Sequence, residues 1–165
     1  MKNLFIFTML SLISLSVKNY SQDVNIKNNE KAGIDSVAVL FLTDVSDNSP
    51  IQSGLIYPES LEKFKEHMIS ISLEYDSSGH TNAMMLLPAD SLRSMTPAQV
   101  WDNMNRMKHY LNVQKLNTTW HIVKTEIENN IAFVTYDIKD GEQKVMKLKK
   151  DENKWKVILS GKSIF

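Results

Sequence analysis

The sequence predicts a single α+β domain in which helices come first and a curved, four-stranded antiparallel sheet follows. Up to Leu111, apolar residues recur every three or four positions, which is typical of helices that bury one side. From Thr118 onward they recur at every second position, which is typical of strands. Turn-forming pairs such as Asn129-Asn130 divide this last part at regular intervals, and they predict a meander of hairpins.

Ahead of the domain, the first residues have the pattern of an export signal. Lys2 provides a positive start, and the mostly apolar stretch from Leu4 to Leu15 is too short to span a bilayer. Small and polar residues follow up to Ser21, near which we expect cleavage. An uncleaved membrane anchor is the alternative.

The export signal sets the expected organisation of the chain. We expect a signal peptide over 1–21, a polar, flexible leader over 22–32 and one domain over 33–165, in a periplasmic or extracellular protein. Loss of Lys2 and Lys18 leaves 17 basic and 19 acidic residues, a net charge of −2. A protein so close to neutrality has no electrostatic attraction to nucleic acid, and we expect none as a partner.

Cysteine is absent from the sequence. Its absence excludes disulfides, thiolate nucleophiles and zinc–thiolate sites. We also expect no lipoprotein anchor, because that anchor is attached to a cysteine. The domain must therefore be stabilised by packing, to which three tryptophans and seven of the nine methionines of the sequence contribute.

The first helix is predicted from Asp35, a capping residue, to about Ser46. The uninterrupted apolar run from Val37 to Leu42 is also compatible with a buried strand, and we favour the helix. Asp47 to Pro50 is expected to end it. One face of this helix carries Ile34, Val37, Ala38, Phe41 and Val45.

The next two helices have clearer start signals. Pro58, followed by acidic residues, predicts a helix that ends near Gly79. Thr96-Pro97-Ala98-Gln99 is a capping box with proline at the first helical position, and it predicts a helix up to about Leu111. Between these helices, the segment from His80 to Met95 is expected to hold a short buried turn or helix.

Four strands are expected to follow, over about 119–127, 131–139, 142–150 and 154–160. Two-residue loops are predicted at Asn129-Asn130, Asp140-Gly141 and Glu152-Asn153. Such loops fix a register that pairs Ile127 with Ala132, Thr125 with Val134, Val123 with Tyr136, Tyr136 with Val145, Phe133 with Leu148, Leu148 with Val157 and Met146 with Leu159.

Alternation along these strands sorts the side chains between two faces. The face with the large aromatics is expected to receive the helices, and it carries Trp120, Ile122, Phe133, Met146, Leu148, Trp155, Val157 and Leu159. The other face carries Val123, Val134, Tyr136, Ile138, Val145 and Ile158. We expect four of these to form an interface, for example of a homodimer: Val123, Val134, Tyr136 and Val145. Scattered apolar residues on an ordinary surface are the alternative.

The order of the predicted elements resembles the nuclear transport factor 2-like fold. The resemblance spans residues 33–160, and it depends on Tyr57 to Phe64, Met95 to Trp101 and Val145 to Leu159. It implies a cone in which helices and sheet enclose a pocket, and an outer sheet face through which many members dimerise. Members range from isomerases and dehydratases to subunits without known activity, so the fold alone says little about function.

No complete catalytic motif accompanies this pattern. Asp137 is expected on the helix-facing side, where a buried acid could move protons, but Lys144 opposite makes an ion pair the simpler interpretation. The histidines form no close pair that would favour a metal, and we interpret each as structural or solvent-exposed: His67, His80, His109 and His121. Neither a serine-nucleophile motif nor a glycine-rich phosphate loop is present.

The sequence therefore favours an exported, non-catalytic domain that binds a small apolar ligand or a protein partner, without metal or cofactor. A ligand pocket is expected to have four residues at its rim: Trp101, Met104, Trp120 and Phe133. One alternative is a small isomerase or dehydratase that uses a pocket acid or histidine. The other is an envelope adaptor that binds proteins through the apolar loop Met84 to Leu87.

Overall fold

The computed structural model describes residues 28–77, 87–110, 119–138 and 141–160. The chain divides into two compact units, residues 1–33 and 34–165, and the contacts discussed below lie within the second. Residues 28–32, which we expected within a flexible leader, are helical. The predicted signal peptide and most of the apolar loop Met84 to Leu87 lie outside the described residues. Among the helices that are described, none is both long and apolar enough to cross a membrane.

Residues 28–47 form a helix, so the helical interpretation of the run from Val37 to Leu42 is confirmed. The expected cap at Asp35 is wrong, because Asp35 lies inside the helix. Its carboxylate Oδ1 accepts a hydrogen bond of 2.5 Å from the Thr125 hydroxyl on the sheet. Asn48 ends the helix with a left-handed backbone (φ 54°), as asparagine tolerates. Three residues at four-residue spacing are buried in the core: Ile34, Ala38 and Leu42.

Three further helices form a group of their own, α2 (Pro58–Ser77), α3 (Ala89–Ser94) and α4 (Pro97–Tyr110). The predicted capping box starts α4: the Thr96 amide donates to the Gln99 side chain (2.8 Å), and the Gln99 amide donates to the Thr96 hydroxyl (3.2 Å). Both α3 and α4 contact α2. Phe64 of α2 and Trp101 of α4 meet edge to face, with ring centroids 5.0 Å apart.

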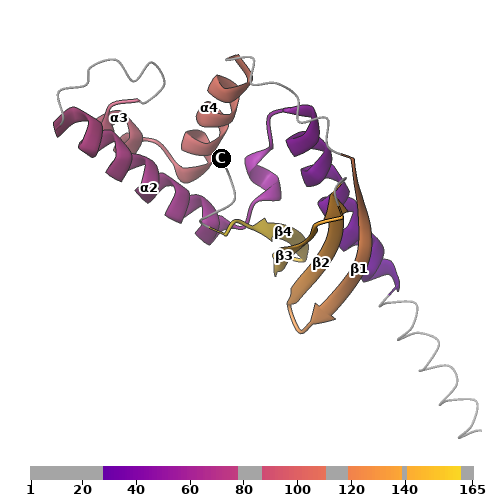
Figure 1. The fold of residues 1–165 in the computed structure, drawn as a ribbon. Helices are drawn as coiled ribbons and strands as arrows, with labels where there is room; N and C mark the ends of the chain where they lie inside the picture. Colours follow the sequence, from indigo (N-terminus) through magenta and orange to yellow (C-terminus); the bar gives the residue numbers. More distant parts are fainter. Residues whose placement is uncertain (1–27, 78–86, 111–118, 139–140, 161–165) are drawn as a thin grey trace, which may run out of the picture. The chain divides into compact units, whose positions relative to one another are not determined.

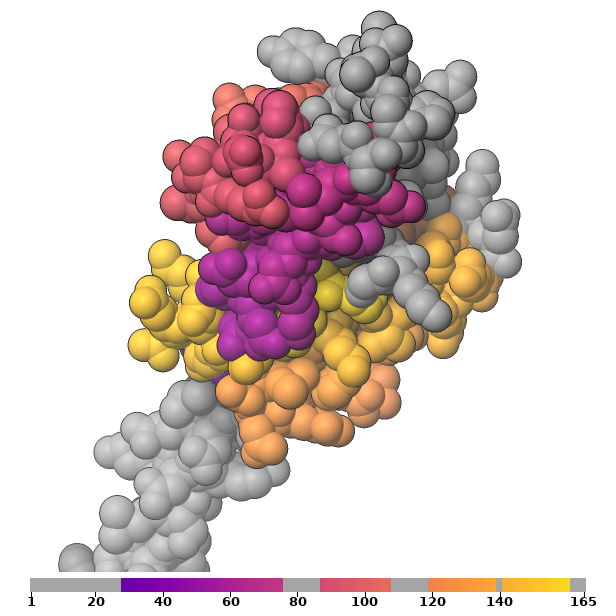
Figure 2. Space-filling view, turned by 90° about the vertical axis from the view of Figure 1, so that its left-hand side faces the viewer, coloured from indigo at the N-terminus to yellow at the C-terminus, as the bar shows by residue number. Residues whose placement is uncertain are grey.

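The sheet is the predicted antiparallel meander, in the order β1 (Trp120–Glu128), β2 (Ile131–Ile138), β3 (Gln143–Asp151) and β4 (Lys154–Ile158). It meets the segment before α2 through β4, where the Tyr57 amide donates to the Val157 carbonyl (2.8 Å). In Figure 2 this segment lies between α2–α4 and the strands. The α+β class is therefore confirmed, and Trp155 is buried as expected.

The predicted register is correct at both ends of the sheet and wrong in its middle. Ile127 pairs with Ala132 and Leu148 with Val157, as expected. The loop after β2 is one residue longer than predicted, since Ile138 and Glu142 are hydrogen-bonded (3.1 Å) with three residues between them. Gly141 adopts φ +79°, the glycine position of a three-residue hairpin loop.

The longer loop shifts three of the predicted pairs by one residue. Tyr136 pairs with Lys144, Phe133 with Lys147 and Asp137 with Gln143. A β-bulge between Ile122 and Lys124 leaves Val123 without a partner, so Ile122 takes its predicted place opposite Tyr136.

These shifts reverse the two faces of β2. Val134 is fully buried and Tyr136 packs against the core, although we expected both on the outer, partner-binding face. Phe133, expected inside, lies on the outer face with the Lys147 ammonium 5.4 Å from its ring centre. A slip of one residue moves every side chain of a strand to the other face, which accounts for the error.

Candidate functional site

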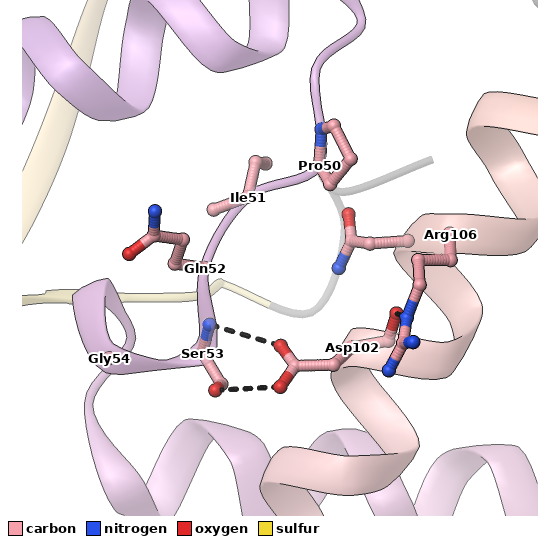
Figure 3. Close-up of a pocket in the computed structure, with 8 residues that line it drawn as sticks. Pro50, Ile51, Gln52, Ser53, Gly54, Asp102 and Arg106 are labelled. Carbon is pink, nitrogen blue, oxygen red and sulfur yellow. Dashed lines mark hydrogen bonds between the residues drawn. The ribbon is translucent and has the colours of Figure 1, made fainter.

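The structure shows an open recess of about 510 Å³ between the segment before α2 and one face of α4 (Figure 3). One wall is the chain from Pro50 to Gly54, and the other consists of Asp102, Asn105 and Arg106. Neither wall was expected from the sequence. Their residues are about fifty positions apart and belong to no recognisable motif.

Two sets of hydrogen bonds hold the recess together. The indole Nε1 of Trp101, a fully buried side chain, donates to the Ile51 carbonyl oxygen (2.8 Å). Next to it, the Asp102 carboxylate accepts from the Ser53 amide (3.2 Å) and from the Ser53 hydroxyl (3.1 Å), as Figure 3 shows. Both carboxylate oxygens of Asp102 therefore serve to fix the turn Ser53–Leu55 against α4.

Polar side chains and apolar surface both line the recess. The Ser53 hydroxyl proton is directed at Asp102, and the lining includes no histidine that could relay it. Asn105 donates to the Trp101 carbonyl oxygen (3.0 Å) and Arg106 to that of Asp102 (3.4 Å). Across the described residues, no three His, Cys, Asp or Glu side chains gather in a way that could hold a metal ion.

The four residues predicted to line an apolar pocket do not come together. Trp101 is buried behind the recess, and Met104 packs against the core from the same helix. Trp120 packs against the core from the inner face of β1, whereas Phe133 lies on the outer face of β2. Because Trp120 and Phe133 stand on opposite faces of the sheet, they cannot share a pocket rim.

Asp137 has a histidine partner in place of the expected lysine. Its Oδ2 lies 3.2 Å from Nε2 of His121, directly across the β1–β2 pair, while Lys144 lies beside Glu142 (3.7 Å). The pair stands on the outer face, His121 is 72% exposed, and neither residue lines the recess. The pair is therefore separate from the recess, whereas an acid–base catalyst would need to stand beside the molecule held there.

The outer face of the sheet is the second candidate site. We define it by the outward residues of β1, β2 and β3, which are His121, Lys124, Glu126, Glu128, Ile131, Phe133, Thr135, Asp137, Gln143, Val145, Lys147 and Lys149. Val145 is 58% exposed and the bulged Val123, beside this face, is 48% exposed. A sheet face with exposed valines and a phenylalanine offers a surface for another protein.

Comparisons with protein-family models, with curated proteins and with solved structures found no match for this chain. Function is therefore argued from the recess and the outer face alone.

Proposed function

We propose that the chain is an exported, non-catalytic binding domain that acts on a protein partner through the outer face of its sheet. The observation that carries this proposal is the exposure of Val145 on the outer face, which also carries the half-buried Phe133, and of the bulged Val123 next to this face. Exposed apolar side chains on a regular surface are typical of contact with another protein.

The geometry favours a protein over a small apolar ligand. Binding of a small apolar molecule depends on a concave, apolar pocket that encloses most of its surface. The recess is open, and its lining combines Ser53, Asp102 and Arg106 with apolar surface, so it does not enclose such a molecule. The outer face needs no enclosure, because a protein partner supplies its own complementary surface.

The adaptor alternative predicted an exposed loop as the binding element, and the sheet takes that role in this proposal. The nuclear transport factor 2-like cone also stays a prediction. Its support is the order of the elements, in which α2, α3 and α4 precede a four-stranded meander.

Site-specific photocrosslinking in cells tests the proposal. A photoreactive amino acid replaces Val145 in the full chain, which is expressed in its native host. The matched control carries the same group at Glu66, an exposed position on α2. We expect a discrete protein adduct from position 145 and none from position 66.

The adduct's mass adds a second result, because it shows whether the partner is another copy of the chain or a different protein. The proposal is wrong if position 145 yields no adduct, or if both positions yield the same adducts in equal amounts.

A further inference from the structure

We infer that the protein bound by the outer face is a different protein from this chain, and that it places a carboxylate against Lys147 among apolar side chains of its own. This inference rests on the proposed function and names the chemistry of the partner. It is carried by the position of Lys147 in the middle of the apolar part of the outer face.

The side chains that surround Lys147 on this face are apolar. The strand register places Phe133 of β2 on one side of it and Ile158 of β4 on the other. β4 continues the outer face here, since Val157, the neighbour of Ile158, is buried on the inner side. Val145 stands two residues away on the same strand and is 58% exposed. A protein that covers Val145 and Phe133 therefore also covers Lys147.

The charge of Lys147 is not compensated by an acid of the chain. Its side chain is exposed, and its ammonium lies 5.4 Å from the centre of the Phe133 ring. No carboxylate of the described residues forms an ion pair with it. By contrast, the ammonium of Lys156 on β4 lies 2.7 Å from the Asp151 carboxylate. Water is therefore the main solvent of the Lys147 charge as long as the face is uncovered.

A partner that covers this face has to replace that water. Removal of a charged group from water is unfavourable unless an opposite charge and good hydrogen bonds take the place of the water. A carboxylate provides both, because it accepts a charge-assisted hydrogen bond from the Lys147 ammonium. The partner surface that fits this part of the face thus has an acidic side chain flanked by apolar ones.

Most other charged side chains on this side of the sheet already have a partner within the chain. The close contacts are Lys124 with Glu126 (2.6 Å), His121 with Asp137 (3.2 Å), Lys156 with Asp151 (2.7 Å) and Lys149 with the Tyr57 ring (4.6 Å to its centre). Glu128 and Lys154 form no such contact among the described residues, and they lie at the ends of β1 and β4. The uncompensated charge next to the apolar residues is therefore positive.

The same contacts make a second copy of the chain a poor source of the carboxylate. Three of the four acids on this side of the sheet already have a basic partner, as the preceding distances show. Glu128 is the fourth, and it lies at the end of β1, two strands away from β3. We therefore expect the acidic group to come from a different protein.

Charge substitutions at Lys147, combined with photocrosslinking from position 145, test the inference. The full chain carries the photoreactive group in its native host, together with Lys147→Glu, Lys147→Arg or the control Lys154→Glu. The control makes the same change of charge at another exposed lysine on this side of the sheet. We expect Lys147→Glu to reduce the adduct about tenfold or more, because it places two acids opposite each other. Lys147→Arg and Lys154→Glu should stay within about threefold of the parent.

A second measurement identifies the group that lies opposite Lys147. The parent adduct is treated with a carbodiimide, which joins an amine directly to a carboxylate, and mass spectrometry locates the new bond. We expect Nζ of Lys147 to be joined to an Asp or Glu side chain of the partner. This readout uses the unchanged lysine, so it does not depend on how well the variants fold.

The possible results separate this inference from the proposed function. An adduct that Lys147→Glu leaves unchanged, or that Lys154→Glu lowers equally, would overturn the inference and leave the proposed function standing. An adduct made of two copies of this chain would do the same. If the parent gives no adduct from position 145, both are wrong.

Discussion

The two faces of β2 have different surroundings, although their residues alternate along a single strand. Ala132 and Val134 point inward and are completely buried. Phe133 and Thr135 point outward, where a lysine lies over the phenylalanine ring. The larger aromatic side chain is therefore on the exposed face and the smaller ones are in the core. In β2, side-chain size does not indicate which face is buried; the strand register determines which side chains enter the core.

The comparison also separates stability from function. The inner face meets helix 28–47 through a buried cluster that includes Ile34 and Leu148, and changes there should affect folding. The outer face carries exposed Val145 and charged side chains, and changes there should affect binding of a partner. The following predictions test this division, from the largest expected effect to the smallest.

The largest difference is expected between aspartate substitutions at adjacent positions of β2. Val134→Asp places an unpaired charge in the core, and it should cost about 3–5 kcal/mol or prevent folding. Thr135→Asp points outward and should cost about 1 kcal/mol or less. Urea unfolding followed by circular dichroism measures both. Equal losses would show that the two faces do not differ in this way.

A truncation pair on β3 should show a smaller effect of the same kind. Leu148 is fully buried, so Leu148→Ala removes core contacts and should cost about 2–5 kcal/mol. Val145→Ala, on the outer face, should cost less than about 1 kcal/mol. If Val145→Ala proved the more destabilising of the two, the assignment of faces on β3 would be wrong.

The polar contacts of the two faces should differ in the same direction. Thr125→Val removes the hydroxyl that donates to Asp35 at the helix–sheet contact, and it should cost about 1–2 kcal/mol. His121→Gln alters the pair between the exposed His121 and the largely buried Asp137, and should cost less than about 1 kcal/mol. The free energy of unfolding in urea measures both. A costlier His121→Gln would give the Asp137 pair a structural role that the exposure of His121 does not predict.

The smallest effect concerns Tyr136, whose pKa is raised above its ordinary value by burial and by the nearby charge of Glu142. Below pH 10 the phenol is neutral in both states and contributes nothing to pH dependence. Above pH 10 it ionises more readily when unfolded, so stability should fall as pH rises. Tyr136→Phe should therefore lose less stability than the parent between pH 9 and pH 11. Identical losses in unfolding experiments would place the phenol in ordinary solvent.

Much of the fold is predictable because its signals are local. The capping box at Thr96 involves residues three positions apart, and the turn at Glu152-Asn153 depends on two adjacent residues with positive φ. The register of β2 against β3 is less local. Asp140-Gly141 has the composition of a two-residue loop, and whether one more residue joins the loop depends on packing of the whole sheet. The bulge at Val123 has no sequence signal either, because it also depends on packing of the whole sheet.

The candidate sites were less predictable than the elements. The recess depends on Ser53 and Asp102, which meet only because Trp101 holds the Ile51 carbonyl oxygen across a distance of fifty positions. The outer face was expected as a binding surface, and Val145 was correctly placed on it. The residues predicted at its centre were wrong, because the shifted register places Val134 in the core and Phe133 on the outer face. Alternation can define two faces, but the face that meets the helix is fixed by tertiary contacts.

The most direct test of the division between the faces is thiol labelling in this cysteine-free chain. Single cysteines replace Val134 and Thr135, and their alkylation rates are measured under native conditions. We predict that Thr135→Cys reacts rapidly, whereas Val134→Cys, in the core, reacts slowly. Faster labelling at position 134 than at position 135 would contradict the account.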